Sequence, residues 1–316
     1  MRTIVGLEAL SPSERGSVVT VGTFDGVHLG HRGLIARTIE EAERVDADSV
    51  ALTWDRHPAE TLRPDKVPPR LTTPARKLEL LEETGVDVVA ILPFDKELSL
   101  MPAEDFVRDV LVGGLKVRGV LVGHDWRFGH KAAGTVPLLT ELGRELGFEV
   151  QGVDLQTVAG EPVTSSRVRR AVRGGDMDLA RVLLGRPYDL DGVVVRGAAR
   201  GKGLGYPTAN LEVEPALARP PIGIYAGAAR VGDRKVPAAI SVGVGPTFGG
   251  EAGKSPVTIE AYLLDFDRDI YGQTIRLEFW KRLRDEQKFD STEALVEQMD
   301  KDVAETRELT SGLGTW

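Results

Sequence analysis

The chain has 316 residues, of which 41% are hydrophobic and 28% charged, and its formal net charge is −8. It is too long for one ordinary core and fits two soluble domains. The absence of cysteine excludes disulfides, thiolate metal sites and a cysteine nucleophile. Because the apolar runs are short and the net charge is acidic, we expect no export signal, no membrane span and no broad capture of nucleic acid. These features indicate a cytoplasmic protein.

Short β-branched runs alternate with helical patterns in the first half of the sequence. We expect strands at residues 18–22, 49–54, 86–92, 117–123 and 148–154. Helices are expected at 29–44 and from Pro74 through Leu81, where proline suits the first turn. This βαβ alternation predicts an α/β domain with a parallel, doubly wound sheet, which binds ligands at the carboxyl ends of its strands.

The second half has a different pattern, with short strand-like runs punctuated by glycine and proline. The runs lie at residues 191–197, 223–231, 235–244, 256–266 and 274–280. Because no helical pattern separates them, they predict an antiparallel β-barrel. A terminal helix is expected from Ser291 to about Glu308. We place the boundary between the domains in residues 184–190, which gives domains at 1–184 and 185–316.

The sharpest local pattern is VGTFDGVHLGH at residues 21–31. Two histidines flank a glycine where a strand ends and a helix begins, and a helix N-terminus offers free amides to a phosphate. Gly30 lets a nucleotide approach the backbone, and His28 and His31 can donate hydrogen bonds to phosphate oxygens that gain charge. A lone histidine is more often structural, but this spacing after a strand favours nucleotide chemistry.

These residues resemble the HxGH nucleotidyltransferase superfamily, which transfers nucleotides from ATP and releases pyrophosphate. The neighbouring motifs narrow the resemblance to the FMN adenylyltransferase module of bacterial bifunctional flavin synthetases. They are GTFDGVHLGH (22–31), TWDRHP (53–58), VGHDWRFGHKAAG (122–134) and VTSSRVRR (163–170). The resemblance implies a Rossmann-like domain with a parallel sheet.

The resemblance also implies roles for individual residues of this domain. His28 and His31 would be catalytic, and His57, Pro58, Asp125 and Phe128 would bind flavin, with Trp126 in the same segment. Nucleotide and phosphate would be bound by Gly22, Phe24, Gly30, Ser165, Ser166, Arg167 and Arg169. Two alternatives stay open: residues 164–169 as an ordinary helix cap with a solvated basic face, and His57 as a turn residue before proline.

The second strong pattern is GAARGKGLGYPTANL at residues 197–211. Its glycines make a loop able to wrap phosphates, and Gly201, Lys202, Gly203 and Gly205 are the expected phosphate-binding residues. The spacing does not match a Walker A loop. Thr208 and Asn210 present two hard oxygen ligands on one side of an extended chain, as magnesium prefers. PTAN is otherwise a simple loop terminus.

This segment resembles the riboflavin kinase signature, which implies a six-stranded antiparallel barrel with a terminal helix. Later motifs follow in the same order as in that family: GIYAG (223–227), SVGVGPTF (241–248), VTIEAYLLDFDRDIYG (257–272) and RLRDEQKF (282–289). By this likeness Glu260 is the catalytic base and Arg284 lies near the flavin. As bare features, Glu260 is a solvent-facing strand residue, and a salt bridge to Asp285 or Glu286 explains Arg284. The sequence departs from the family at Gly245, where Arg or Asn is usual.

The two resemblances together imply a two-step synthesis of flavin cofactors. Riboflavin and ATP would give FMN, and FMN and a second ATP would give FAD, with Mg²⁺ bound alongside ATP. One rival is another nucleotidyltransferase, such as a nicotinamide or pantetheine enzyme or a trimmed tRNA synthetase, which does not explain the barrel. Another is a flavin-binding regulator without activity, and a third is a chain with one active domain. Homo-oligomers occur in similar proteins, but no sequence feature here establishes an interface.

Overall fold

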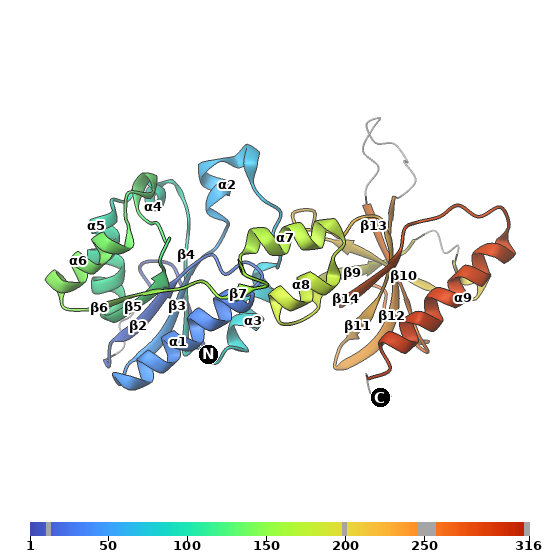
Figure 1. The fold of residues 1–316 in the computed structure, drawn as a ribbon, viewed down its shortest axis with the longest axis horizontal. Helices are drawn as coiled ribbons and strands as arrows, with labels where there is room; N and C mark the ends of the chain where they lie inside the picture. Colours follow the sequence, from blue (N-terminus) through green and yellow to red (C-terminus); the bar gives the residue numbers. More distant parts are fainter. Residues whose placement is uncertain (11–13, 198–200, 245–256, 313–316) are drawn as a thin grey trace. The chain divides into compact units, whose positions relative to one another are not determined.

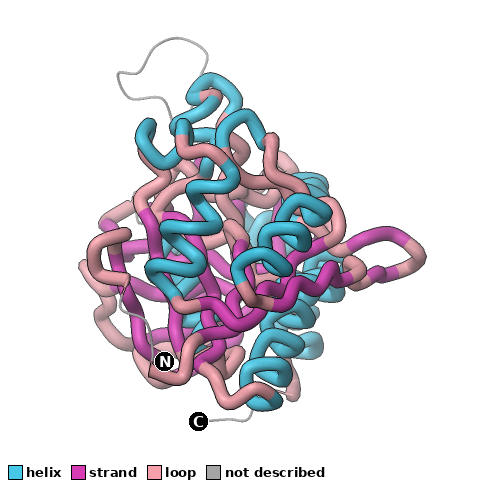
Figure 2. The backbone as a smooth tube through the Cα atoms, turned by 90° about the vertical axis from the view of Figure 1, so that its left-hand side faces the viewer, coloured by secondary structure: helices cyan, strands magenta, loops and turns pink. Residues whose placement is uncertain are grey.

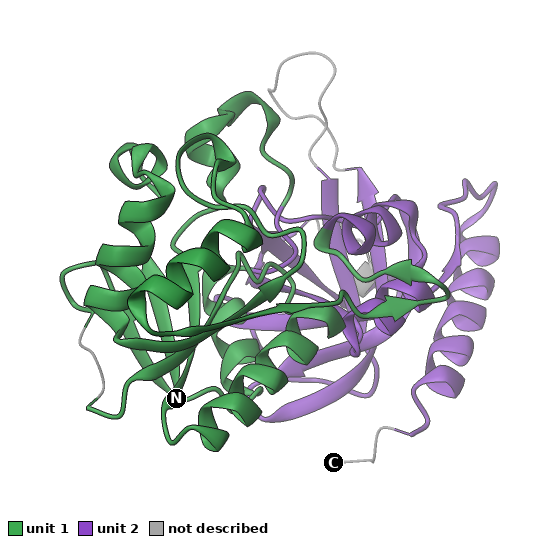
Figure 3. Cartoon of the chain, turned by 60° about the vertical axis from the view of Figure 1, so that its left-hand side comes forward, with its two compact units in different colours: residues 1–69, 73–165 green, residues 70–72, 166–316 purple. Residues whose placement is uncertain are grey.

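The computed structural model of the chain describes residues 1–10, 14–197, 201–244 and 257–312. The chain forms two compact units, drawn in different colours in Figure 3. Unit 1 contains residues 1–69 and 73–165, and unit 2 contains residues 70–72 and 166–316. By its internal contacts the chain therefore divides between Ser165 and Ser166. A domain boundary at residues 184–185 stays a prediction.

Unit 1 is built on a six-stranded parallel sheet, as expected for a doubly wound α/β domain (Figure 1). The strands are β1 (Arg2–Val5), β2 (Ser17–Val21), β3 (Asp48–Trp54), β4 (Val88–Leu92), β5 (Val117–Gly123) and β6 (Glu149–Val153). Their spatial order is β1-β4-β3-β2-β5-β6. The order reverses between β2 and β5, so ligands are expected beyond the carboxyl ends of these two strands.

Helices cover both faces of this sheet because alternate strand residues point to opposite sides (Figure 2). The helices are α1 (Leu29–Arg44), α2 (Pro58–Leu62), α3 (Pro74–Glu82), α4 (Lys96–Leu100), α5 (Ala103–Asp105) and α6 (Val136–Leu146), with a π-helical stretch η2 (Phe106–Gly114) and short 3₁₀ turns η1 (Pro64–Lys66) and η3 (His130–Ala132). On one face Ala51 packs with Ile35 of α1 and Leu80 of α3. On the other, Leu52 packs with Leu111 of η2 and Leu139 of α6.

Unit 1 ends with a short hairpin of β7 (Thr157–Val158) and β8 (Glu161–Pro162). The next helix, α7 (Ser165–Gly174), begins at the last residue of unit 1, and α8 (Met177–Leu184) follows it. α8 packs against strands of the barrel, and its residues Leu183 and Leu184 are fully buried. This packing explains why residues 166–184 belong to unit 2 by their contacts.

Unit 2 is a closed six-stranded antiparallel barrel with a long terminal helix, as the family resemblance implied. The strands are β9 (Tyr188–Val195), β10 (Thr208–Val213), β11 (Gly223–Val231), β12 (Arg234–Val244), β13 (Val257–Leu263) and β14 (Thr274–Arg284), with a 3₁₀ turn η4 (Gly201–Leu204). Around the barrel they run β10-β13-β12-β11-β14-β9. The terminal helix α9 (Thr292–Leu309) lies alongside β11 and β12 (Figure 1).

A three-residue segment from the first half of the sequence also belongs to unit 2. The Arg70 amide donates to the Ala216 carbonyl at 2.8 Å, and the Ala218 amide donates to the Arg70 carbonyl at 2.7 Å. The Leu71 side chain is 1% exposed. Backbone hydrogen bonds and one buried leucine therefore attach residues 70–72 to the barrel unit.

Inside the barrel, large side chains from several strands fill the core. Tyr225 of β11 packs edge-on against Phe279 of β14, with ring centroids 5.5 Å apart, and both are fully buried. The pairing of β11 with β14 shifts register between Ala226 and Gly227. At that shift the two backbones approach so closely that a Cβ on Gly227 would overlap the Glu278 carbonyl oxygen. Glycine is therefore required at position 227, where β11 and β14 approach closely.

We expect Gly227→Ala to destabilise unit 2 by about 1–3 kcal/mol, the usual cost of overpacking a tight site, because the clash is with backbone. Denaturant unfolding of the full chain measures the effect. Gly174→Ala is the matched control, since its added Cβ meets no atom within 4 Å. Equal unfolding midpoints for the two variants would contradict this account of the bulge.

Candidate functional sites

The first site forms at the N-terminus of α1, beyond the carboxyl end of β2. The loop between them turns sharply, with positive φ values of 48° at Phe24 and 40° at Val27. His28 is the N-cap of α1, and its Nδ1 accepts a hydrogen bond from the His31 amide at 3.3 Å. A side-chain acceptor at this position satisfies one of the free amides of the first turn. The first histidine therefore has a structural role in addition to its expected chemistry.

The two histidines of the motif form one packed unit. Their rings stack with centroids 3.6 Å apart and an interplanar angle of 17°. Phe24 meets His31 edge-on at 5.2 Å, and His28 is only 4% exposed. A Cβ on Gly30 would lie 3.0 Å from the Val163 carbonyl oxygen and 3.2 Å from the His28 ring. Glycine is needed here for close packing, and the imidazoles are held rigidly at the positive end of the helix dipole.

A cavity of about 480 Å³ opens over this helix terminus. Its lining includes His28, Gly30 and His31, together with Asp125 and Ser165. Ser165 is anchored through its Oγ, which donates to the Asp25 carbonyl at 3.0 Å. Histidine side chains, a hydroxyl and the free amides of a helix terminus together suit an anionic ligand such as a nucleotide phosphate.

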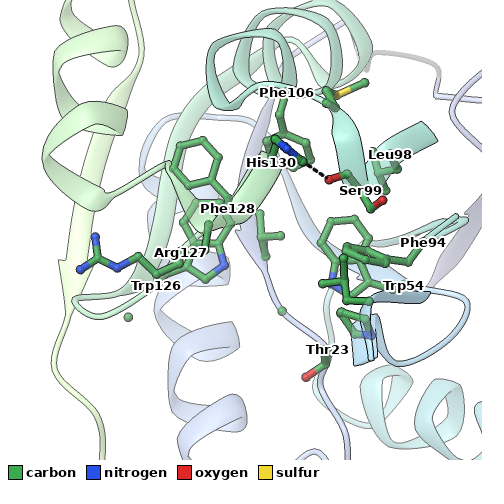
Figure 4. A pocket seen from close by; sticks show the side chains of 18 of the residues that line it. Thr23, Trp54, Phe94, Leu98, Ser99, Phe106, Trp126, Arg127, Phe128 and His130 are labelled. Carbon is green, nitrogen blue, oxygen red and sulfur yellow. Dashed lines mark hydrogen bonds between the residues drawn. The ribbon is translucent and has the colours of Figure 1, made fainter. Parts of the chain in front are cut away.

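A larger cavity of about 810 Å³ shares His31 and Asp125 with the first one. Figure 4 shows Trp126 and Phe128 on one side of it and Trp54 and Phe94 on the other. Trp126 and Phe128 stack with centroids 4.5 Å apart, and Trp54 meets Phe94 edge-on at 5.3 Å. A cavity of this size with two aromatic walls suits a flat, conjugated ring system.

Most of the residues expected at these cavities line them, and four do not. Gly22, Phe24, Pro58, Asp125 and Phe128 line the larger cavity. His57 is not among the lining residues; it caps α2, where its Nδ1 accepts from the Ala59 amide at 3.1 Å and Glu60 completes a capping box. Its assignment to flavin stays a prediction. Ser166, Arg167 and Arg169 belong to unit 2, and their role in nucleotide binding also stays a prediction.

Sequence reasoning missed three aromatic residues of the larger cavity: Trp54, Phe94 and Phe106. The sequence carried a signal for two of them, Trp54 and Phe94. Trp54 is the last residue of β3, and Phe94 follows the end of β4 by two positions. Carboxyl ends of parallel strands carry ligand sites, so aromatic residues at these ends could have been assigned to the site. Phe106 lies in η2, and no sequence signal connects it to the cavity.

The second site lies on the outer face of the barrel, on β10 and β13. Glu260 pairs in register with Asn210 of β10 and with Ser241 of β12. Its neighbours Ile259 and Ala261 point inward and are buried, so Glu260 points outward. The Thr208 hydroxyl donates to Glu260 Oε2 at 3.0 Å. The structure therefore brings together three of the residues expected for kinase chemistry.

Arg284 is held by a carboxylate that sequence reasoning did not identify. Its guanidinium donates to Asp302 of α9 from Nε at 2.9 Å and from Nη2 at 2.6 Å. The Asp302 side chain is 8% exposed. Arg284 also donates to the Asp285 backbone carbonyl at 3.0 Å, so its ion pair is with Asp302 and not with the neighbouring Asp285 or Glu286 side chains. Flavin binding by Arg284 stays a prediction.

The glycine-rich loop before β10 is described in part. Gly205 has φ +87°, a conformation that favours glycine, and a Cβ on Gly203 would meet no atom within 4 Å. The side chain of Lys202 and the whole of Gly245 lie outside the described residues. The phosphate-binding role of Gly201, Lys202, Gly203 and Gly205 stays a prediction.

Tyr206, at the end of this loop, links the site to α9. Its hydroxyl donates a hydrogen bond to Asp300, and its ring meets Tyr262 edge-on at 5.1 Å. The hydrogen bond to Asp300 raises the pKa of Tyr206 from 10.0 to about 12. This interaction therefore stabilises the fold below pH 10 and is lost as the pH rises towards 12.

We expect the tyrosinate absorbance of the folded protein to include a late step near pH 12 that Tyr206→Phe removes. In Asp300→Ala the same step should move to lower pH, because the acceptor that favours the neutral phenol is gone. Spectrophotometric titration of the three proteins measures both effects. An unchanged titration in Tyr206→Phe would contradict this assignment.

Comparisons with known proteins match both halves of the chain. A family model described as FAD synthetase matches residues 10–167, and one described as riboflavin kinase matches residues 184–310. The bifunctional riboflavin kinase/FMN adenylyltransferase of Pseudomonas fluorescens is 36% identical over 98% of this chain and 98% of its own length. The enzyme of the same description from Escherichia coli K12 is 35% identical over 98% of this chain and 97% of its own.

A solved structure is also similar along almost the whole chain. It is titled as a macrolide-efflux protein from Streptococcus pneumoniae, with a TM-score of 0.88 and 30% identity over 97% of this chain and 99% of its own. In the described part of this chain, no helix is long and apolar enough to span a membrane. From the two family models and the relatives matched along nearly their full length, the chain belongs to the family of bifunctional riboflavin kinase/FMN adenylyltransferases and carries both activities.

Proposed function

We propose that the two reactions occur at the two separate sites described above. FMN would be adenylylated at the paired cavities of unit 1, and riboflavin would be phosphorylated at Glu260 of unit 2. The observation that best supports adenylylation at unit 1 is that its two cavities share His31 and Asp125. One cavity suits a flat aromatic ring and the other suits phosphates, and their common wall is where two substrates would meet.

In the adenylylation, the FMN phosphate attacks the α-phosphorus of ATP and pyrophosphate leaves. Charge builds up on the oxygens of that phosphorus in the transition state. His28 and His31 would donate hydrogen bonds to these oxygens, assisted by the amides at the start of α1. Their stacked arrangement is already fixed, so little reorganisation is needed.

The isoalloxazine ring of FMN would lie between the two aromatic walls of the larger cavity. Trp126 and Phe128 would cover one face, and Trp54 and Phe94 the other (Figure 4). Stacking of this kind binds a conjugated ring firmly without depending on a particular charge. The position of the ring would direct the FMN phosphate towards His31.

In the kinase reaction, Glu260 would accept the proton of the riboflavin 5′-hydroxyl as that oxygen attacks the γ-phosphorus of ATP. The Thr208 hydroxyl orients this carboxylate through its hydrogen bond at 3.0 Å. Thr208 and Asn210 also supply hard oxygen atoms of the kind that magnesium binds. When bound there with ATP, Mg²⁺ would neutralise phosphate charge. A cytoplasmic location fits this chemistry and is part of the proposal, and the molar mass in solution would show whether the chain forms a homo-oligomer.

His28→Asn should lower FAD formation from supplied FMN by about 100- to 1000-fold, the usual cost of one transition-state donor. Asparagine is a good N-cap, so the helix start is preserved and the loss reports on the imidazole. Chromatography of flavin products measures the rate, and FMN formation from riboflavin by the same protein is the control. Normal FAD formation by this variant would contradict the role of His28.

Glu260→Gln should show the opposite result. The amide keeps an acceptor for Thr208 but is not a base, so FMN formation should fall by about 100-fold or more. FAD formation from supplied FMN should stay normal. If either this variant or His28→Asn stopped both reactions, the assignment of two separate sites would be wrong.

A further inference from the structure

The phosphate cavity of unit 1 continues along α1 beyond the two histidines. Its lining includes Gly30, Gly33, Leu34 and Arg37, which lie on one side of successive turns. At 1.5 Å per residue, Gly30 and Arg37 are about 10 Å apart along the helix axis. With phosphates at the helix N-terminus, this extension offers room for the rest of a nucleotide.

The opposite wall of this extension is formed by the segment after β6, which includes Gln156. The backbone of Gln156 is fixed, since its carbonyl accepts from the Val163 amide at 2.8 Å. Its side chain faces α1, because a Cβ on Gly33 would lie 3.3 Å from Gln156 Oε1. The amide oxygen of Gln156 therefore lies close to the backbone of α1 at Gly33.

The side chains of Gln156 and Arg37 are not held by hydrogen bonds or ion pairs with other described residues. Within residues 1–10, 14–197, 201–244 and 257–312, the Gln156 amide makes no hydrogen bond and the Arg37 guanidinium makes no ion pair or hydrogen bond. A primary amide provides one donor and one acceptor group side by side, and adenine presents a matching donor and acceptor at N6 and N7. The planar guanidinium of arginine stacks on aromatic rings.

We propose that Gln156 selects the adenine base of ATP during adenylyl transfer and that Arg37 stacks on the same base. The inference rests on the assignment of adenylyl transfer to the cavity of His28 and His31. Gln156 would favour a 6-amino purine over a 6-oxo purine, which lacks the donor at that position. Arg37 would hold either purine, because stacking does not depend on the edge groups of the base.

The test compares ATP with GTP as nucleotide donors to FMN, with FAD and its guanine counterpart separated by chromatography. Gln156→Ala, which removes both the donor and the acceptor of the amide, should lower the preference for ATP over GTP, measured as a ratio of kcat/KM, by about tenfold or more. The change should appear in the KM for nucleotide and leave the KM for FMN unaltered. Arg37→Ala should raise the KM for both nucleotides together.

Gln151→Ala is the matched control, because Gln151 lies on β6 outside the cavity lining and undergoes the same truncation. Phosphorylation of riboflavin by each variant, with ATP, shows that the chain is folded. An unchanged ATP preference in Gln156→Ala, or an equal change in Gln151→Ala, would overturn the proposal. Normal FAD formation by His28→Asn is a separate result. It would show that adenylyl transfer is wrongly assigned to the cavity of His28 and His31, whatever the nucleotide preference of the Gln156 variant.

Discussion

The placement of the α1 N-terminus at the carboxyl edge of the sheet is the constraint on which the adenylylation site depends. It is produced by the buried strand β2, by a loop with positive φ values and by the side chain of His28, which caps the helix. The same histidine stacks on His31. Because capping and stacking are satisfied together, the two imidazoles need no separate element to orient them.

This constraint also determines where the two cavities open. The order of strands reverses beside β2, so the cavities open where β2 and β5 end. The larger cavity is enclosed by residues from distant segments: Trp54 from the end of β3, Phe106 from η2 and Phe128 from the loop after β5. In the proposed arrangement, a flavin and a nucleotide would bind on either side of His31.

The kinase site follows a different design, because it lies on the outer face of a closed barrel. Register alone places Asn210 and Ser241 beside Glu260. Thr208 adds a direct hydrogen bond to the carboxylate, and α9 is fastened nearby through Tyr206–Asp300 and Arg284–Asp302. Strand pairing thus positions the reactive groups, and the terminal helix holds the surrounding loops.

The sequence predicted those features that depend on local spacing. The helix at 29–44, which begins at the HxGH motif, and the change from a parallel sheet to an antiparallel barrel were confirmed, since each is set by residues close together in the chain. It missed β1, whose four residues are mostly exposed and gave no strand signal. It also missed the partner of Arg284, because Asp302 comes from a helix 18 positions away. The aromatic walls were incomplete in part for the same reason: Phe106 reaches the cavity only through the fold.

The most direct test of the two successive reactions follows the phosphates of ATP into the products. The protein would be incubated with riboflavin, magnesium and ATP labelled either at the α- or at the γ-phosphate, and the flavins separated over time. Two sites acting in turn predict γ-label in FMN first and then in FAD, with α-label entering FAD alone. Appearance of α-label in FMN, or of FAD without γ-label, would contradict the account.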